Sequence, residues 1–175
     1  MMTLDYKVES NTDEKYLHMA FTKTEADARK KWILDNITSP KTLDYTKCNV
    51  RVKDLINKEL VLFSIADNVR SIPSLVDGLK PSQRKIIYAC IKRNLYSEIK
   101  VSQLAGYVSE VSSYHHGEAS LQDTIIGLSQ TFVGSNNMNL LEPVGQFGTR
   151  LLGGKDSSSP RYIFTHLSKN FKNIF

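Results

Sequence analysis

The period of amphipathic helices is clearest between residues 53 and 132. Within 53–70, apolar side chains three and four positions apart fall at Leu55, Ile56, Leu60, Phe63 and Ile65. This spacing predicts a mostly buried helix, because such side chains share one helical face. A connector rich in turn-forming residues follows. Pro81 suits the first turn of the next helix, where its missing N–H has no partner to lose.

Three further helical patterns come after this connector. The helix that begins at Pro81 is predicted to bury Ile86, Ile87, Cys90 and Ile91. Segments 100–113 and 117–132 carry apolar stripes at Leu104, Val108 and Val111, and at Leu121, Ile125, Leu128 and Phe132; Ser102 is a candidate cap for the first of them. A tight turn, Tyr-His-His-Gly at 114–117, separates them. Two helices joined by a short turn match the helix-turn-helix pattern, whose second helix commonly enters the DNA major groove.

The helical period disappears after residue 133, where glycine becomes frequent. Glycines stand at positions 134, 145, 148, 153 and 154. Their frequency suits hairpins and a long loop, because glycine adopts backbone conformations closed to other residues. A helix-turn-helix followed by a Gly-rich hairpin is a winged-helix layout. We therefore predict an α+β domain that is mainly α-helical with a small β wing.

The first 46 residues are polar and mixed. Residues 22–33 predict a short helix with Thr24 as its N-cap. The dipeptide Ser39-Pro40 and the scattered polar residues around it suit a linker. We therefore place a domain boundary near residue 46, which separates 1–46 from a second domain at 47–175.

The composition is that of an ordinary globular protein. Of 175 residues, 41% are hydrophobic and 23% charged, which argues against general disorder. The longest apolar run, 60–66, is too short to cross a bilayer, and no secretory signal opens the chain, so we expect no membrane partner. The two cysteines, Cys48 and Cys90, lack zinc-ligand spacing, which favours reduced thiols in an intracellular protein.

The positive charge is concentrated in one stretch. The net charge is +5, and residues 70–100 hold seven basic side chains against Asp77 and Glu98, which equals the whole excess. The basic residues are Arg70, Lys80, Arg84, Lys85, Lys92, Arg93 and Lys100. Such a concentration favours a polyanionic partner, of which nucleic acid is the commonest inside cells. The alternative is a helix face that is merely solvated.

Two other motifs resemble ligand sites but do not fit them. Residues 153–158, Gly-Gly-Lys-Asp-Ser-Ser, do not match a phosphate loop, because the required glycine is replaced by Thr149 and Asp156 would repel a phosphate. The adjacent histidines His115 and His116 point apart on a turn and lack a third ligand at a suitable spacing. His116 instead precedes the N-terminus of a helix, where phosphate also binds well.

Arg161 and Tyr162 follow three serines and a proline. A tyrosine after a loop is most often a packed aromatic residue. A phenol is also a poor nucleophile unaided, but a neighbouring guanidinium can neutralise the charge that develops on an attacked phosphate. Within a basic domain, an Arg-Tyr pair on a loop therefore has the groups needed to attack a phosphodiester.

Several motifs together resemble one family. They are YHHGE at 114–118, FVGSNN at 132–137, QFGTR at 146–150, GGKD at 153–156 and SPRYIFT at 159–165. From about residue 18 to the end, the chain resembles type IIA DNA topoisomerases of the eukaryotic topoisomerase II branch. This resemblance implies the winged-helix DNA-binding and cleavage domain of an ATP-dependent enzyme that acts on double-stranded DNA as a two-fold homodimer.

The resemblance also implies roles for individual residues. Tyr162 would attack the DNA backbone and form a transient 5′-phosphotyrosyl link, with Arg161 and His116 as further catalytic residues. Its supporting residues would be the DNA-binding Arg70, Lys80, Arg84 and Lys85, with Asp77 orienting the cations. The ester keeps the energy of the broken bond, so that resealing needs no ATP.

The chain departs from the family in what it lacks. The family's magnesium site uses a Glu and an Asp-x-Asp pair in the TOPRIM domain, and this sequence has no Asp-x-Asp. Residues 1–46 resemble only the tail of that domain and its linker. We therefore expect Mg²⁺ and ATP to bind outside this chain, no metal ligands within it, and no DNA cleavage by the chain alone.

Two other classes of protein remain as alternatives. One is a winged-helix module that only binds DNA; the other is a recombinase or single-subunit topoisomerase, which would attach its tyrosine to the 3′ end. The source genome, cellular or viral, stays open. The expected compartment is the nucleus in the first case, and the cytoplasm or nucleus of a host cell in the second.

Overall fold

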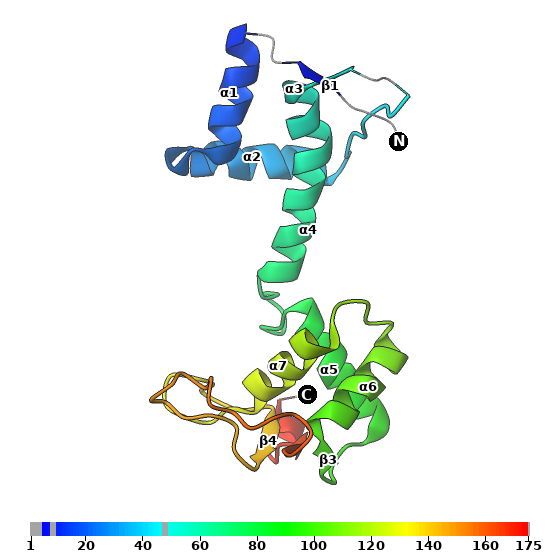
Figure 1. Cartoon of the computed structure of the whole chain (residues 1–175), viewed down its shortest axis with the longest axis vertical. Coiled ribbons are helices and arrows are strands. Elements are labelled where there is room, and N and C mark those ends of the chain that lie inside the picture. The colour runs from blue at the N-terminus through cyan, green and yellow to red at the C-terminus, as the bar shows by residue number, and fades with distance from the viewer. Residues whose placement is uncertain (1–4, 8–9, 47–48, 175) are drawn as a thin grey trace. The chain divides into compact units, whose positions relative to one another are not determined.

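The computed structural model describes residues 5–7, 10–46 and 49–174. The chain divides into two compact units, Met1–Ile72 and Pro73–Phe175, each with its own helices (Figure 1). This division differs from the boundary near residue 46 that the sequence suggested. The physical reason is that residues after 51 bind the helices before them: the backbone N–H of Lys53 donates to Asp13, and the Trp32 indole donates to Asn57.

The first unit is built on a long helical segment. Helices α1 (Ser10–Phe21) and α2 (Ala26–Ile37) are joined by a 3₁₀ turn (Lys23–Glu25), and strand β1 (Asp5–Lys7) pairs in parallel with β2 (Asn49–Arg51). Helix α3 (Val52–Leu55), a π-helical turn (Ile56–Leu60) and α4 (Val61–Ser71) follow one another directly, which confirms the helix predicted at 53–70. The helix predicted at 22–33 begins later, at Ala26, so Thr24 lies in the 3₁₀ turn and does not cap it.

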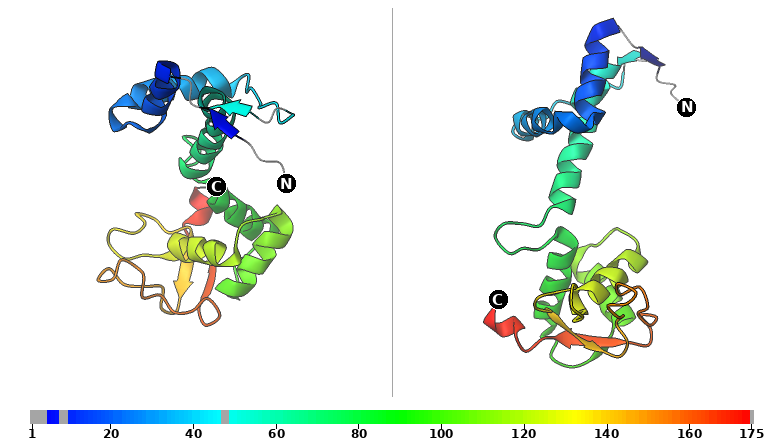
Figure 2. Two further views of the ribbon diagram at one scale, coloured as in Figure 1. Left: turned by 45° about the horizontal axis from the view of Figure 1, so that its top comes forward. Right: turned by 90° about the vertical axis from the view of Figure 1, so that its left-hand side faces the viewer.

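The second unit contains three helices and a small sheet (Figure 2). The helices are α5 (Pro81–Arg93), α6 (Val101–Ser112) and α7 (Glu118–Ser129). Strands β3 (Ile99–Lys100), β4 (Leu141–Val144) and β5 (Phe164–Leu167) form an antiparallel sheet in the order β3-β5-β4, and a 3₁₀ turn (Phe171–Asn173) follows. A mainly α-helical fold with a small β wing is thereby confirmed. Lys100, and not Ser102, is the N-cap of α6.

The predicted stripes form the core of this second unit. Fully buried side chains come from all three helices, from β4 and from the residue before β5: Ile86, Cys90, Val101, Leu104, Val108, Leu121, Ile125, Leu141 and Ile163. Ile91 was predicted to be buried but is 51% exposed. At roughly 100° of rotation per residue it lies about 40° beyond Ile87, at the edge of the buried stripe. Phe132 lies beyond the end of α7.

The wing is a strand pair with a long intervening loop. β4 and β5 align Leu141 with Leu167 and Val144 with Phe164. The loop between them, residues 145–163, carries Tyr162 near its end. In Figures 1 and 2 this loop projects from the unit on the side away from α6. Over the parts of the chain that the structure describes, no helix is long and apolar enough to span a bilayer.

Candidate nucleic-acid interface and reactive tyrosine

Tyr162 lies in the turn that leads into β5, and its side chain is 66% exposed. The backbone around it is nevertheless held firmly. The first two N–H groups of α6 donate to this segment: Val101 to the carbonyl of Ile163 at 3.0 Å, and Ser102 to that of Pro160 at 3.2 Å. Ile163 is itself buried in the core. The phenol is therefore presented to solvent from a fixed backbone.

Arg161 lies against the ring of Tyr162. Its guanidinium carbon is 4.9 Å from the ring centroid, and both side chains are exposed. This distance is typical of a cation–π contact. The contact places a permanent positive charge beside the phenol, where an approaching phosphate would meet both groups. We refer to Arg161 and Tyr162 as the tyrosine pair.

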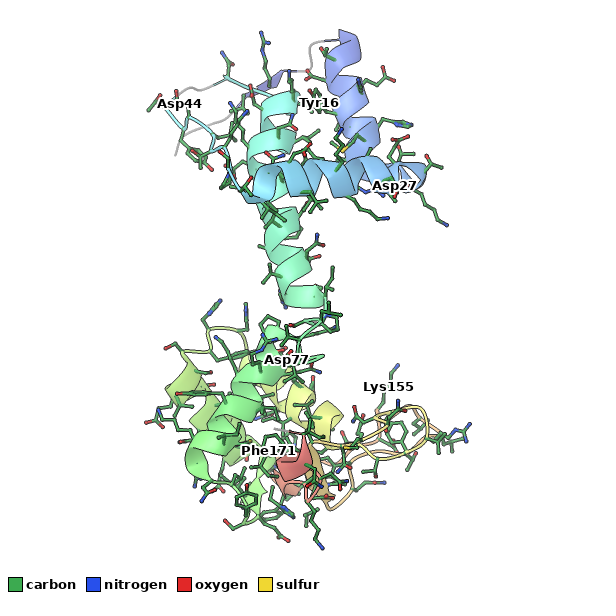
Figure 3. All side chains as sticks on the ribbon, turned by 180° about the vertical axis from the view of Figure 1, so that it is seen from behind. Tyr16, Asp27, Asp44, Asp77, Lys155 and Phe171 are labelled. Carbon is green, nitrogen blue, oxygen red and sulfur yellow. The ribbon has the colours of Figure 1, made fainter. Side chains whose placement is uncertain are left out.

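A second group of predicted residues centres on the start of α5, and Asp77 anchors it. Asp77 accepts two hydrogen bonds from Arg84, at 2.6 Å from Nε and 2.8 Å from Nη2, and one from the backbone N–H of Leu79. The Arg84 guanidinium, followed by the Leu79 N–H, lowers the pKa of Asp77 to about 2. The same pairing raises the pKa of Arg84. Asp77 (labelled in Figure 3) thus holds the guanidinium against the loop 73–80.

The neighbouring lysines lie on the same helix. Lys80 is the N-cap of α5 and is exposed; its backbone N–H donates to Oε1 of Gln83 at 2.9 Å. Lys85 places its Nζ 5.8 Å from the ring centroid of Tyr114. Arg70 is exposed on α4, in the first compact unit.

His116 belongs to an aromatic cluster in the turn between α6 and α7. Its ring meets the edge of Tyr114 at 5.4 Å and lies 4.2 Å from that of His115. Tyr114 packs against the core and also lies under Lys85, so it connects α5 with the histidine turn. Sequence reasoning did not identify Tyr114. The available signal was its place between the end of a helix and a histidine pair.

The structure therefore sorts the predicted residues of the second unit into two groups at different ends of α6. The tyrosine pair is bonded to the first turn of this 12-residue helix, and His116 comes four residues after its last turn. At 1.5 Å per residue, the helix separates them by roughly 18 Å. We call the second group the cationic cluster: Lys80, Arg84, Lys85 and His116, with Asp77.

The glycine-rich motif at 153–158 and the cysteines have structural roles. Asp156 accepts hydrogen bonds from the backbone N–H and the hydroxyl of Thr149, both at 2.8 Å, and these bonds lower its pKa. Residues 153–158 thus belong to a closed turn and do not wrap a phosphate. Burial raises the pKa of the Cys90 thiol to about 12, so it stays protonated; Cys48 lies outside the described residues. Among the residues that are described, no group of three or more His, Cys, Asp or Glu is placed to hold a metal ion.

Comparison with known proteins covers nearly the whole chain. Residues 70–175 match the model of the DNA gyrase/topoisomerase IV family, and residues 2–68 match that of the C-terminal associated domain of TOPRIM. DNA topoisomerase 2 of Candida albicans is 57% identical over 93% of this chain, and DNA topoisomerase 2-alpha of Homo sapiens is 54% identical over 98%. The chain spans only 11% and 12% of those two proteins.

One solved structure matches both the sequence and the fold. It is the crystal structure of the Plasmodium falciparum topoisomerase II DNA-binding, cleavage and re-ligation domain, with a TM-score of 0.75 and 49% sequence identity. The match covers 98% of this chain and 23% of that one. The similarity therefore extends over both compact units.

Proposed function

The chain belongs to the DNA gyrase/topoisomerase IV family, in its eukaryotic topoisomerase II branch, and from this we propose that it is the DNA-binding and cleavage segment of an ATP-dependent type II DNA topoisomerase. Its substrate is double-stranded DNA, and Tyr162 is the residue that breaks and rejoins it. The alternative is a winged-helix module that binds DNA without cutting it.

The observation that carries this proposal is the presentation of Tyr162. A nucleophile that must reach a phosphate in a duplex has to be exposed, and it also has to be held in position. The phenol of Tyr162 is 66% exposed, while its backbone is bonded to the start of α6 and followed by the buried Ile163. A tyrosine that served only as packing would have its ring in the core.

The chemistry is a reversible transfer of a phosphoryl group. The Oη of Tyr162 attacks the phosphorus, and the bond from phosphorus to the 3′ oxygen breaks. The phenol proton is lost, the departing 3′ oxygen takes up a proton, and the 5′ phosphate remains as an ester of Tyr162. Attack by the 3′-hydroxyl on this ester reverses each step, so rejoining consumes no ATP.

The cations have separate tasks in this scheme. Arg161 lies beside the phenol and stabilises the charge on the attacked phosphate. Lys80, Arg84, Lys85 and, from the first unit, Arg70 bind the backbone, mostly without regard to base sequence. His116 is a catalytic donor to the same phosphate, oriented by the ring of Tyr114.

Two copies of the chain are needed to complete each site. Within one chain, α6 holds the tyrosine pair and the cationic cluster about 18 Å apart, too far for both to contact one phosphate. A two-fold dimer allows the tyrosine pair of one protomer to face the cationic cluster of its partner. We therefore propose a homodimer with two composite sites, one for each DNA strand.

Mg²⁺ and ATP belong to the complete enzyme. A magnesium site needs several oxygen ligands close together. The carboxylates that the structure describes are dispersed or already bonded, as Asp77 is to Arg84 and Asp156 to Thr149, so the chain does not fit the ion. We place both cofactors on parts of the enzyme outside this chain.

The deciding experiment identifies the DNA end that carries the protein. Cleavage by the complete enzyme is stopped with detergent, and duplexes labelled at either the 5′ or the 3′ end are examined after protease digestion. We expect a peptide on the 5′ end and a free 3′-hydroxyl. A peptide on the 3′ end would place the enzyme with recombinases, and the absence of any adduct would favour the binding-only module. The compartment stays a prediction: the nucleus, or a host cell if the genome is viral.

A further inference from the structure

The loop between β4 and β5 ends in a tip that exposes two leucines. Leu151 is 90% exposed and Leu152 is 56% exposed. Arg150 and Lys155 flank them and are exposed as well. Figure 3 shows Lys155 extending from the loop into solvent. We call residues 149–156 the wing tip; none of its side chains takes part in the site described above.

The wing tip is closed at its base by specific bonds. The carboxylate of Asp156 bonds both the N–H and the hydroxyl of Thr149, and the N–H of Gly154 donates to the Thr149 carbonyl at 2.9 Å. The two arms of the loop cross where only glycine fits, because a Cβ on Gly148 would lie 2.5 Å from the Cα of Gly154. The conformation of the tip is therefore determined before any ligand binds.

A side chain from the end of α7 also fixes the direction of the tip. Nε2 of Gln130 donates to the carbonyl of Phe147 at 2.9 Å and to that of Gly154 at 3.3 Å. Phe147 is buried, so this attachment ties the loop to the core. The two leucines are thus kept in solvent because the loop cannot fold back over them. A rigid apolar tip of this kind loses little conformational entropy on binding.

The charge around the leucines favours DNA as the ligand. Loop 145–163 carries Arg150, Lys155 and Arg161 against Asp156 alone, and that carboxylate is bonded within the loop. The second unit as a whole has eleven Lys and Arg against seven Asp and Glu. Leucine forms no hydrogen bond with a phosphate, so its presence calls for an apolar surface. In a duplex that surface is the face of a base pair, reached from the minor groove.

We propose that the wing tip is a DNA-deforming element: Leu151 and Leu152 enter the minor groove and wedge against a base step, while Arg150 and Lys155 bind the phosphates on either side. This inference rests on the proposed function, since it takes DNA as the ligand, and it adds a local distortion of the duplex to it. Unstacking is least costly at pyrimidine–purine steps. The wedge therefore supplies a preference for flexible steps that phosphate contacts alone do not give.

The test uses the 175-residue chain and short duplexes that carry 2-aminopurine, a base whose fluorescence rises when it is unstacked. One set places the probe at a TA step, and another places it within an A-tract. At saturating protein we expect a rise of several-fold at the TA step and little change in the A-tract. Leu151→Ala with Leu152→Ala should abolish this rise, while circular dichroism verifies the fold.

Two further variants separate the wedge from general affinity. Leu151→Lys with Leu152→Lys adds charge and removes the wedge, so it should bind DNA at least as tightly and still give no fluorescence rise. Leu75→Ala removes a leucine that is equally exposed but lies outside the loop, and it should behave as the unaltered chain does. Arg150→Ala with Lys155→Ala should reduce the salt dependence of binding by about two phosphate contacts.

The outcomes distinguish the two levels of the proposal. Failure of the unaltered chain to bind duplex DNA would overturn the proposed function together with the wedge. Binding without any fluorescence rise, or a rise that survives in the alanine variant, would overturn the wedge alone. A variant that keeps the DNA signal but changes self-association in sedimentation would show that the wing tip contacts protein and not DNA.

Discussion

Asp77 and Arg84 form a two-point ion pair, with Nε 2.6 Å from Oδ2 and Nη2 2.8 Å from Oδ1. Asp77 is bonded in turn to the backbone of Leu79, so the guanidinium takes its orientation from the loop that precedes α5. A planar, two-point contact sets the direction of a guanidinium much better than a single bond does. The remaining surface of Arg84 is exposed and faces solvent.

We predict that Asp77→Asn separates DNA binding from cleavage. The variant loses the charged partner of Arg84 but also one negative charge beside bound phosphates. DNA affinity should therefore stay equal or rise, while single-turnover cleavage by the complete enzyme should fall by roughly tenfold or more, as when a transition-state donor is misplaced. Glu98→Gln removes the same charge from an exposed position and serves as the control. Equal cleavage by the two variants would contradict an orienting role.

The same ion pair predicts an unusual titration. Because the pKa of Asp77 is lowered from 3.8 to about 2, its contribution to folding stability is present above 3.8 and is lost as the pH falls through about 2. The pair should thus remain intact at about pH 3. Carboxyl carbon shifts followed by NMR should place the Asp77 midpoint near pH 2, and Arg84→Ala should return it toward 3.8.

Tyr162→Phe should abolish cleavage and relaxation by the complete enzyme while leaving DNA binding nearly unchanged. Phenylalanine keeps the ring that lies against Arg161 and removes only the nucleophilic oxygen. Tyr88→Phe alters another exposed tyrosine, one that lies under Lys92, and should have no effect. Residual covalent adduct in the Tyr162 variant would show that a different residue attacks.

Mixed dimers test whether the sites are composite. One protomer carries Tyr162→Phe and the other His116→Ala. If each site combines residues of two protomers, one site contains both changes and the other contains neither, so one strand should be nicked at close to the normal rate per site. If each site belongs to one protomer, both sites are damaged and nicking should fall by on the order of 10²-fold. Strand-specific cleavage on an end-labelled duplex tells the two cases apart.

The 175-residue chain alone should bind duplex DNA and not cut it. Its basic residues offer several phosphate contacts, so log Kd should change steeply and linearly with log salt, with little dependence on sequence outside the flexible steps. Cleavage should be absent because the chain has no carboxylate cluster, among its described residues, to hold Mg²⁺. Supercoiled plasmid incubated with the chain and Mg²⁺, then treated with detergent and protease, should stay supercoiled. Linear or nicked product would mean that the cations alone suffice.

The sequence by itself determined the helices, most of the core and the family. Burial on one face of a helix has a fixed period, so Leu104, Val108 and Leu121 could be assigned to the core from spacing alone. The motif around Tyr162 identified the proposed nucleophile in the same way, because a turn rich in serine and proline is a local feature.

The tertiary structure decided what joins distant parts of the chain. The bonds from Lys53 to Asp13 and from Trp32 to Asn57 moved the division of the units to residue 72, and no periodicity reports such contacts. The arrangement around α6 is of the same kind: which end meets Tyr162 depends on how residues 101 and 163 pair across the fold. Hydrogen bonds between remote residues leave no period in the sequence, so only the folded chain shows that the tyrosine pair and the cationic cluster lie apart.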